Sequence, residues 1–381
     1  MEKQLNHQAL NTRCEEKGLN QAAIAKQLDL SRTAVSKWFS GKSFPRPAEL
    51  LKLGRLLGLR HSDLVQETGL VEEPLVAFRK RQGCKTTDRH IRRAQDMGHL
   101  LRPIVPYLDF DAFVGPPSLK NPSTDYRYLQ ELVAKLRREI DVGEDAPVEF
   151  SKLIEIFENY QAVIVPTLWG KKSKHENALH IHLPDSQTTW IYLNLDVEVH
   201  DFKFWMVHEL GHVLTIDLLE AGRIEEAEDF SDAFAGAFVF PEPAAKEAFQ
   251  AYRRLRSDSR RLDLLCEWAE AHTISPVSVY KEMEHYAKAH GLSFHEIDGP
   301  RVYQTATQFN QQFNSLAEQF FDGEQPSANQ FIRVAQEKFG TEFFKAFSEY
   351  LRDKQPSSSN IASILCVNPM DARAYHDALS Q

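Results

Sequence analysis

A His-Glu-Leu-Gly-His motif at positions 208–212 constrains this chain more than any other feature. It lies within residues 201–219, whose apolar pattern predicts a helix. At 3.6 residues per turn, His208 and His212 share one face, so both imidazoles can converge on a single Zn²⁺. Glu209, on an adjacent face, can then serve as general base toward the attacking water. The alternative is that both histidines are ordinary packed residues of a buried helix.

A catalytic zinc site needs a third protein ligand and an open fourth position. The next helix, expected over residues 224–240, carries five acidic residues: Glu225, Glu226, Glu228, Asp229 and Asp232. We expect Glu228 to complete a His-His-Glu site that holds one zinc ion per chain. Asp232, one turn later, can accept the free ring N–H of a ligand histidine. The alternative is that the acidic cluster is only a solvated helix face.

Residues 125–243 resemble the ImmA/IrrE family of metallopeptidases in their order of a helix, a β-hairpin, the histidine motif and a Glu-x-x-x-Asp-x-Phe-Ala stretch that ends at Pro241. The chain departs from the family pattern at Ser231, where alanine is usual, and at residues 238–240. The resemblance implies a zinc endopeptidase with ligands His208, His212 and Glu228 and with Glu209 as catalytic base.

Three short β-branched and aromatic runs, residues 162–166, 178–183 and 188–195, predict a small sheet, with residues 184–187 as a hairpin turn. The last run directly precedes the histidine helix, so we expect it to pair with an extended substrate. Tyr192 and Asn194 are then candidate substrate contacts. A second oxyanion donor is left open among five residues: His180, His182, His200, Tyr192 and Tyr280.

The first 70 residues predict short helices, of which residues 21–28 and 31–39 are spaced as a helix-turn-helix. Ser31 is placed to cap the second helix, and Val35 and Trp38 to anchor its inner face. Four side chains of that helix then point outward as base readers: Arg32, Thr33, Ser36 and Lys37. Gln21 can contact phosphate. The alternative is a generic helical hairpin with a solvated basic face.

Residues 5–67 resemble the Xre/Cro-type repressor domain, including the Gly-x-x-x-Pro stretch that begins at Gly41. The resemblance implies binding of double-stranded operator DNA and, because such domains bind two half-sites, a homodimer. Charge agrees with a DNA-binding head. Residues 1–103 hold 19 Lys and Arg against 11 Asp and Glu, a net charge of +8, which leaves 26 against 43, or −17, for the rest.

The whole chain of 381 residues therefore predicts a mainly α-helical α+β protein. We expect an all-α helix-turn-helix domain over residues 1–69, a basic, proline-rich connector over 70–124, a zincin-like metallopeptidase domain over 125–298 and a helical C-terminal region over 299–381. Four widely spaced cysteines predict free thiols. The absence of a long apolar run or a signal sequence predicts a cytoplasmic protein with no membrane partner, bound to the bacterial nucleoid when on DNA.

These features predict a DNA-binding transcriptional regulator with a zinc-dependent endopeptidase domain that cleaves a protein substrate, either a repressor- or antitoxin-like partner or the chain itself. The resemblances imply a bacterial stress or phage response. The alternative is a transcription factor whose metal domain is a non-catalytic sensor or structural module. A weaker alternative is a toxin–antitoxin component that represses its own operon.

Overall fold

The computed structural model describes residues 3–28, 30–40, 43–60, 64–67, 72–77, 88–109, 118–170 and 177–380. The chain forms two compact units, one built on residues 1–73 and the other on most of residues 74–380. None of the described helices is long and apolar enough to cross a membrane. The mainly helical α+β class predicted from the sequence is confirmed.

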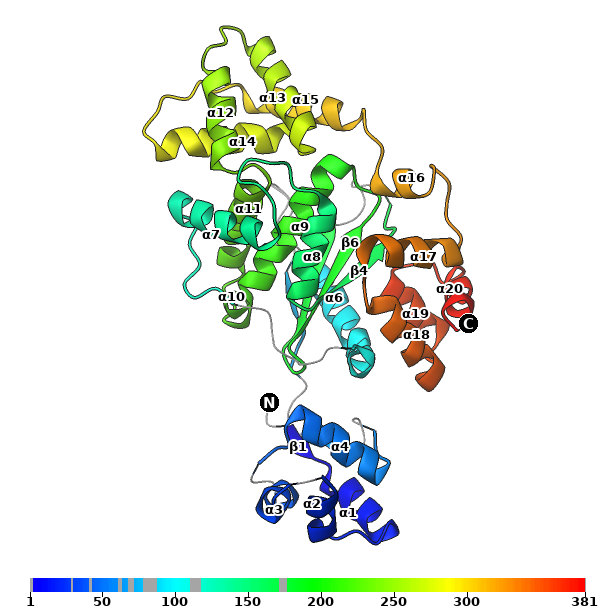
Figure 1. Ribbon diagram of the computed structural model, residues 1–381. Helices are drawn as coiled ribbons and strands as arrows, with labels where there is room; N and C mark the ends of the chain where they lie inside the picture. Colours follow the sequence, from blue (N-terminus) through cyan, green and yellow to red (C-terminus); the bar gives the residue numbers. More distant parts are fainter. Residues whose placement is uncertain are drawn as a thin grey trace. The chain divides into compact units, whose positions relative to one another are not determined.

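The first unit is a small helical domain (Figure 1). Its elements are β1 (Lys3–Leu5), α1 (His7–Glu16), α2 (Gln21–Leu28), α3 (Arg32–Phe39), α4 (Pro47–Leu57) and β2 (Val65–Glu67). Helix α3 begins where predicted, because Ser31 caps it by accepting a hydrogen bond from the Ala34 N–H. Val35 and Trp38 are buried in the core, and Leu30 packs against that core from the turn between α2 and α3.

Strands β1 and β2 pair antiparallel and join the two ends of this unit. They are a feature that the all-α prediction did not include. The prediction of short helices alone in the first 70 residues is wrong at Val65–Glu67, which is a strand; residues 61–63 and 68 lie outside the described part of the chain. Gly58 ends α4 with a positive φ of 67°, a conformation that glycine adopts without steric cost.

The second unit is built around a four-stranded sheet of order β3-β5-β6-β4. Its strands are β3 (Leu75–Ala77), β4 (Ala162–Thr167), β5 (Ala178–Leu183) and β6 (Thr188–Asn194). Strand β5 is antiparallel to both neighbours, whereas β4 is parallel to β6. The predicted hairpin and its two strands are confirmed. Every residue of β6 is buried, because this central strand has helices on both faces.

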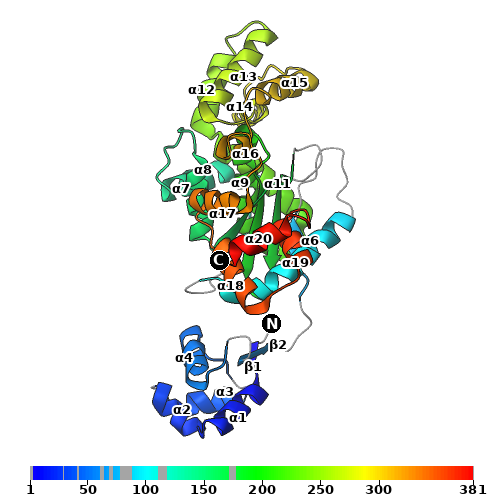
Figure 2. The same ribbon diagram turned by 90° about the vertical axis from the view of Figure 1, so that its right-hand side faces the viewer.

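Helices cover both faces of the sheet (Figures 1 and 2). On one face lie α8 (Phe150–Asn159), α9 (Val199–Leu214), α10 (Ile216–Glu220) and α11 (Ile224–Val239). On the other lie α6 (Asp88–Leu101), α18 (Phe343–Lys354) and α19 (Ser358–Leu365). Trp190 of β6 packs edge-on against Phe343, which places α18 opposite the α9 face.

The remaining helices extend this layer arrangement. They are the 3₁₀ helix η1 (Arg102–Tyr107), α7 (Tyr126–Glu139), α12 (Glu242–Tyr252), α13 (Asp258–His272), α14 (Pro276–Ala289), α15 (Gly299–Asn310), α16 (Leu316–Phe320), α17 (Ala328–Phe339) and α20 (Ala372–Leu379). Helices α12 to α15 form one group, and α7 lies against α11 and α14. The single helix predicted over 201–219 instead breaks at Thr215.

Two predicted boundaries differ from the structure. Within the expected connector at 70–124, β3 pairs with β5 and α6 packs on the sheet, so these elements are part of the second unit. Beyond residue 299, α15 packs on α13 and α14, while α17 and α18 contact β4. Local composition marked both segments as separate, but long-range pairing with the sheet includes them in one core.

Candidate metal centre

The histidine helix α9 is buried on nearly all sides, which holds its motif rigidly against α11. A Cβ on Gly211 would lie 2.6 Å from the Ser231 Oγ and 2.7 Å from its Cα. Only glycine therefore allows α9 and α11 to approach this closely. The close approach brings Glu228 of α11 up to the face of α9 that carries His208 and His212, as the spacing of the motif predicts.

Three side chains converge at this contact. The His208 and His212 Nε2 atoms are 3.2 Å apart, the Glu228 Oε2 lies 3.6 Å from the His208 Nε2, and the Glu228 Oε1 lies 3.3 Å from the His212 Nε2. Two atoms bound at about 2.0–2.1 Å to one tetrahedral zinc are separated by about 3.4 Å. The donor separations therefore fit a single metal ion, and these three buried residues form the group among the described residues that can hold one.

The electrostatics of the three groups favour a bound cation. Burial lowers the pKa of His208, but hydrogen bonds with Asp232 and Glu228 outweigh burial and raise it to about 9. Burial raises the pKa of Glu228, but bonds to both histidines outweigh burial and lower it to about 2. Burial lowers the pKa of His212, with Glu228 opposing the shift. The negative carboxylates therefore stabilise a positive charge at this position. A proton or a metal ion can supply that charge.

Two residues orient the imidazole rings. The Asp232 Oδ1 lies 3.0 Å from the His208 Nδ1, as expected for a group that fixes a ligand ring. The Ser231 Oγ lies 3.2 Å from the His212 Nδ1. Sequence reasoning treated Ser231 as a neutral departure from the family pattern and missed this contact. Its position, three residues after Glu228 on the same helix face, was the signal that could have found it.

Glu209 is buried, with an exposed fraction of 3%, and its charge contributes to the raised pKa of His208. It therefore lies close to the three converging groups. On the sheet side, the His180 ring of β5 packs edge-on against His212 with ring centroids 5.6 Å apart. His180 is fully buried, and neither ring nitrogen has a hydrogen-bond partner among the described residues.

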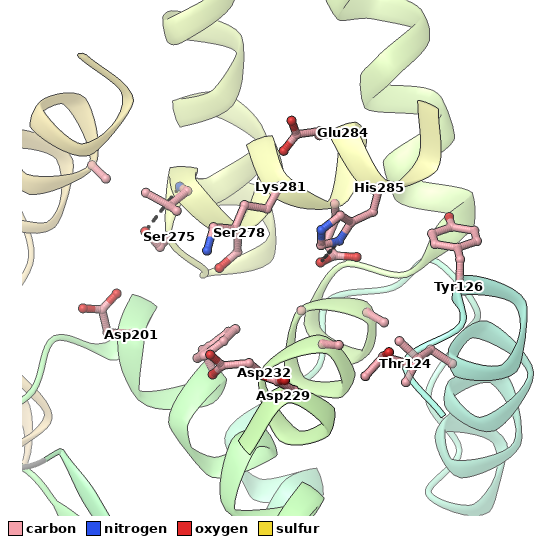
Figure 3. A pocket seen from close by; sticks show the side chains of 18 of the residues that line it. Thr124, Tyr126, Asp201, Asp229, Asp232, Ser275, Ser278, Lys281, Glu284 and His285 are labelled. Atoms are coloured by element: carbon pink, nitrogen blue, oxygen red, sulfur yellow. Dashed lines mark hydrogen bonds and ion pairs between the residues drawn. The ribbon is translucent and has the colours of Figure 1, made fainter. Parts of the chain in front are cut away.

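A cavity of about 970 Å³ adjoins the centre, bounded by α9, α11, α14 and α15 (Figure 3). Asp201, Asp229 and Asp232 line its floor, and three residues face them from the opposite side: Ser278 and Lys281 of α14 and its N-cap residue Ser275. Asp232 belongs to both the cavity and the metal centre, since it contacts the His208 ring. The cavity therefore reaches the centre through Asp232, whereas the three converging groups themselves are buried behind its lining.

The predicted substrate contacts Tyr192 and Asn194 are wrong. Both are fully buried in the central strand β6, which has a partner strand on each side. The Tyr192 hydroxyl donates to the Ile364 carbonyl, and the Asn194 side chain bonds the Trp169 N–H and the Gly170 carbonyl. Their side chains lie on the sheet face opposite α9, because residue 191 is the one paired with His180. They stabilise the fold and do not reach a substrate.

In the first unit, the structure places the predicted base readers on one exposed surface. The side chains of Arg32, Thr33, Ser36 and Lys37 on α3 are exposed, as is Gln21 at the start of α2. The Thr33 hydroxyl also hydrogen-bonds the Ser31 hydroxyl, 3.0 Å away. Within this unit, the exposed face of the second helix is the one that a helix-turn-helix domain inserts into a major groove.

Comparisons with known families identify one domain in each unit. Residues 10–64 match the helix-turn-helix family model, and residues 168–284 match the model of the IrrE N-terminal-like domain. The chain is therefore a fusion of an Xre-type helix-turn-helix domain with an ImmA/IrrE-type metallopeptidase-family domain. Searches of curated proteins and of solved structures returned no match.

Proposed function

We propose that this chain is a transcriptional regulator whose second unit is a zinc-dependent endopeptidase, with one zinc ion per chain. The convergence of His208, His212 and Glu228 at 3.2–3.6 Å carries the proposal. Two imidazoles and one carboxylate are a ligand set of catalytic zinc sites, which keep a fourth position for water or substrate. The cavity that Asp232 shares with the centre is the space in which a peptide would approach it.

Zinc held by His208, His212 and Glu228 would supply Lewis acidity toward the attacking water and the scissile carbonyl. Glu209 accepts a proton from the water and delivers it to the leaving amine. Asp232 and Ser231 hold the rings of His208 and His212 in one tautomer, so the Nε2 atoms stay directed at the metal. Burial of the two histidines, Glu209 and Ser231 strengthens their mutual electrostatics, whereas Asp232 acts from the exposed side.

In the first unit, Arg32, Thr33, Ser36 and Lys37 would read base edges and Gln21 would contact phosphate, in a homodimer on an operator. The exposure of these side chains on α3 supports this role. A repressor-like protein held near the same DNA, or the chain itself, is then the protein substrate. DNA binding would thus bring the peptidase to its target.

Metal analysis of the purified protein is the first test. We expect about one zinc per chain, lost in His208→Ala and Glu228→Ala because each removes a ligand. Glu226→Gln, an exposed neighbour on α11, is the matched control and should keep its zinc. A zinc-replete preparation with no stoichiometric metal would contradict the proposal.

The burial of the centre favours one alternative, a regulator whose metal domain is a non-catalytic sensor. Glu209 is 3% exposed and Glu228 8% exposed, so a substrate has little direct access. Glu209→Gln discriminates the two functions, since it removes the base and leaves the three ligands. Loss of regulatory output with zinc and DNA binding intact supports catalysis; unchanged output supports the sensor.

A further inference from the structure

Strand β3 occupies the edge of the sheet nearest the metal centre. It comes from the segment that follows the DNA-binding unit, yet it pairs antiparallel with β5, with Leu75 opposite His182 and Ala77 opposite His180. Strand β5 has β6 on its other side, so β3 takes up its only other backbone edge. Without β3, the backbone groups along that edge would be open to an added strand.

This edge of β5 borders the metal centre. The His180 side chain packs against the His212 ring, and Ala77 is its direct partner across the β3–β5 pair. Because paired residues share a sheet face, Leu75 and Ala77 point to the same side as His180. They form a cluster with residues of α10 and with Ala227, whose neighbour is Glu228. Strand β3 is thus one residue pair away from the His180 ring that contacts His212, and its cluster includes the residue before Glu228.

Extended peptides commonly bind by adding a strand to an open sheet edge. We propose that β3 is an internal occupant of the peptide-binding edge of β5, so that an extended substrate binds only after residues 74–77 leave. This inference rests on the proposed peptidase function for its biological meaning. The chain then carries its own competitor for substrate, and the metal centre is latent while β3 is in place.

The attachment of β3 suits a removable occupant. The strand has three residues, and Leu75 and Val76 remain partly exposed. Pro74 before it rests on α6, where a Cβ on Gly98 would lie 2.6 Å from the Pro74 Cβ. A strand of three residues can leave the edge without unfolding the sheet, because β5 keeps its pairing with β6. The competing peptide then needs to supply only the backbone pairing that β3 gives up.

Two substitutions in the full-length protein should displace β3. Ala77→Glu forces a carboxylate into an apolar cluster where Ala77 is 1% exposed, and Gly98→Ala pushes against Pro74. The matched controls are Val76→Thr, which keeps a β-branched residue in the strand, and Gly299→Ala, which adds a methyl group where nothing lies within 4 Å. All variants carry Glu209→Gln so that no bound peptide is cleaved.

The probe is a labelled synthetic peptide of residues 72–77, Glu-Glu-Pro-Leu-Val-Ala, with binding measured by fluorescence anisotropy. Hydrogen exchange of the β5 amides, residues 178–183, reports whether the edge is open. We expect faster exchange and at least ten-fold tighter peptide binding in Ala77→Glu, the same direction in Gly98→Ala, and no change in either control.

Two results would overturn the inference: β5 amides that stay protected in both displacing variants, or exposed β5 amides with no gain in peptide binding. Failure of the peptidase proposal has a different signature. In that case the displacing variants gain peptide binding, but versions that retain Glu209 cleave neither this peptide nor casein. The peptide-binding edge would then belong to a binding module. Strand β3 would still block peptide binding, but it would not control a peptidase.

Discussion

At the scale of single residues, the contact between Ser231 and His212 is a support of the centre that the motif does not mark. The hydroxyl fixes the ring whose other nitrogen faces the metal position. Ser231→Ala should therefore weaken zinc affinity about ten-fold, the lower end of the effect of such supporting residues. Competition with a zinc chelator measures this change.

Ser348→Ala is the control, because it also removes one hydroxyl hydrogen bond, the one to the Leu379 carbonyl. Ser348 lies on α18, far from the metal ligands in the sequence. Equal zinc affinity in Ser231→Ala and Ser348→Ala would show that the Ser231 contact does not support the metal site.

His272 makes the stability of the second unit depend on pH. Burial lowers its pKa to about 4, with the charges of Lys203 and Arg137 acting in the same direction. In the unfolded chain the imidazole titrates near 6.5. Between pH 6.5 and 4 the unfolded state therefore binds a proton that the folded state does not. The contribution of the neutral His272 ring to the free energy of unfolding is fully present above about pH 6.5. It is lost as the pH falls toward 4.

This shift corresponds to a loss of up to about 3 kcal/mol in the free energy of unfolding across that window. Denaturant unfolding at several pH values checks it. His272→Gln, which keeps the backbone carbonyl that accepts from Lys203, should flatten the slope. His376→Gln, at a partly exposed position on α20, should leave the slope unchanged.

Residue roles were predictable where a motif fixes the spacing. Residues 208, 212 and 228 meet as the helical repeat and the resemblance implied, and Asp232 lies beside a ligand ring. Ser231 and His180 were not assigned, because their importance depends on how closely α9 and β5 pack, which no local pattern encodes.

At the scale of elements, β6 shows how a correct strand prediction led to a wrong role. The strand lies where expected, but its position in the middle of the sheet depends on partners elsewhere in the chain. Tyr192→Phe should lower the free energy of unfolding by about 1 kcal/mol, the worth of one hydrogen bond to the Ile364 carbonyl. Thermal unfolding measures the loss.

Zinc content and peptide binding should stay unchanged in Tyr192→Phe. A selective loss of peptide binding would restore Tyr192 as a substrate contact and contradict its placement in the core.

Helices were predicted more accurately than short strands. The bounds of α2 agree with the predicted residues 21–28, and Asn20 caps its start by accepting a hydrogen bond from the Ala23 N–H. Strand β3 was missed because three apolar residues carry no periodic signal. Its conformation comes from pairing with β5, about 100 residues later in the chain.

At the scale of the whole molecule, two units with separate cores should unfold as two transitions. Trp38 is 3% exposed in the core of the first unit. Trp38→Ala should cost that unit about 3 kcal/mol or more. Differential scanning calorimetry should show its transition lowered or lost, with the second transition in place. A shift of both transitions by the same amount would contradict independent units.

The origin of β3 also has a consequence for the order of events during synthesis. The first unit is complete once residue 67 has emerged from the ribosome, whereas β3 must wait for β5, about 100 residues further on. At about 5–20 residues per second this interval lasts on the order of 5–20 s. During that time a folded DNA-binding head is tethered to a strand without its partner. A nascent chain could therefore engage DNA before its enzyme-like half exists.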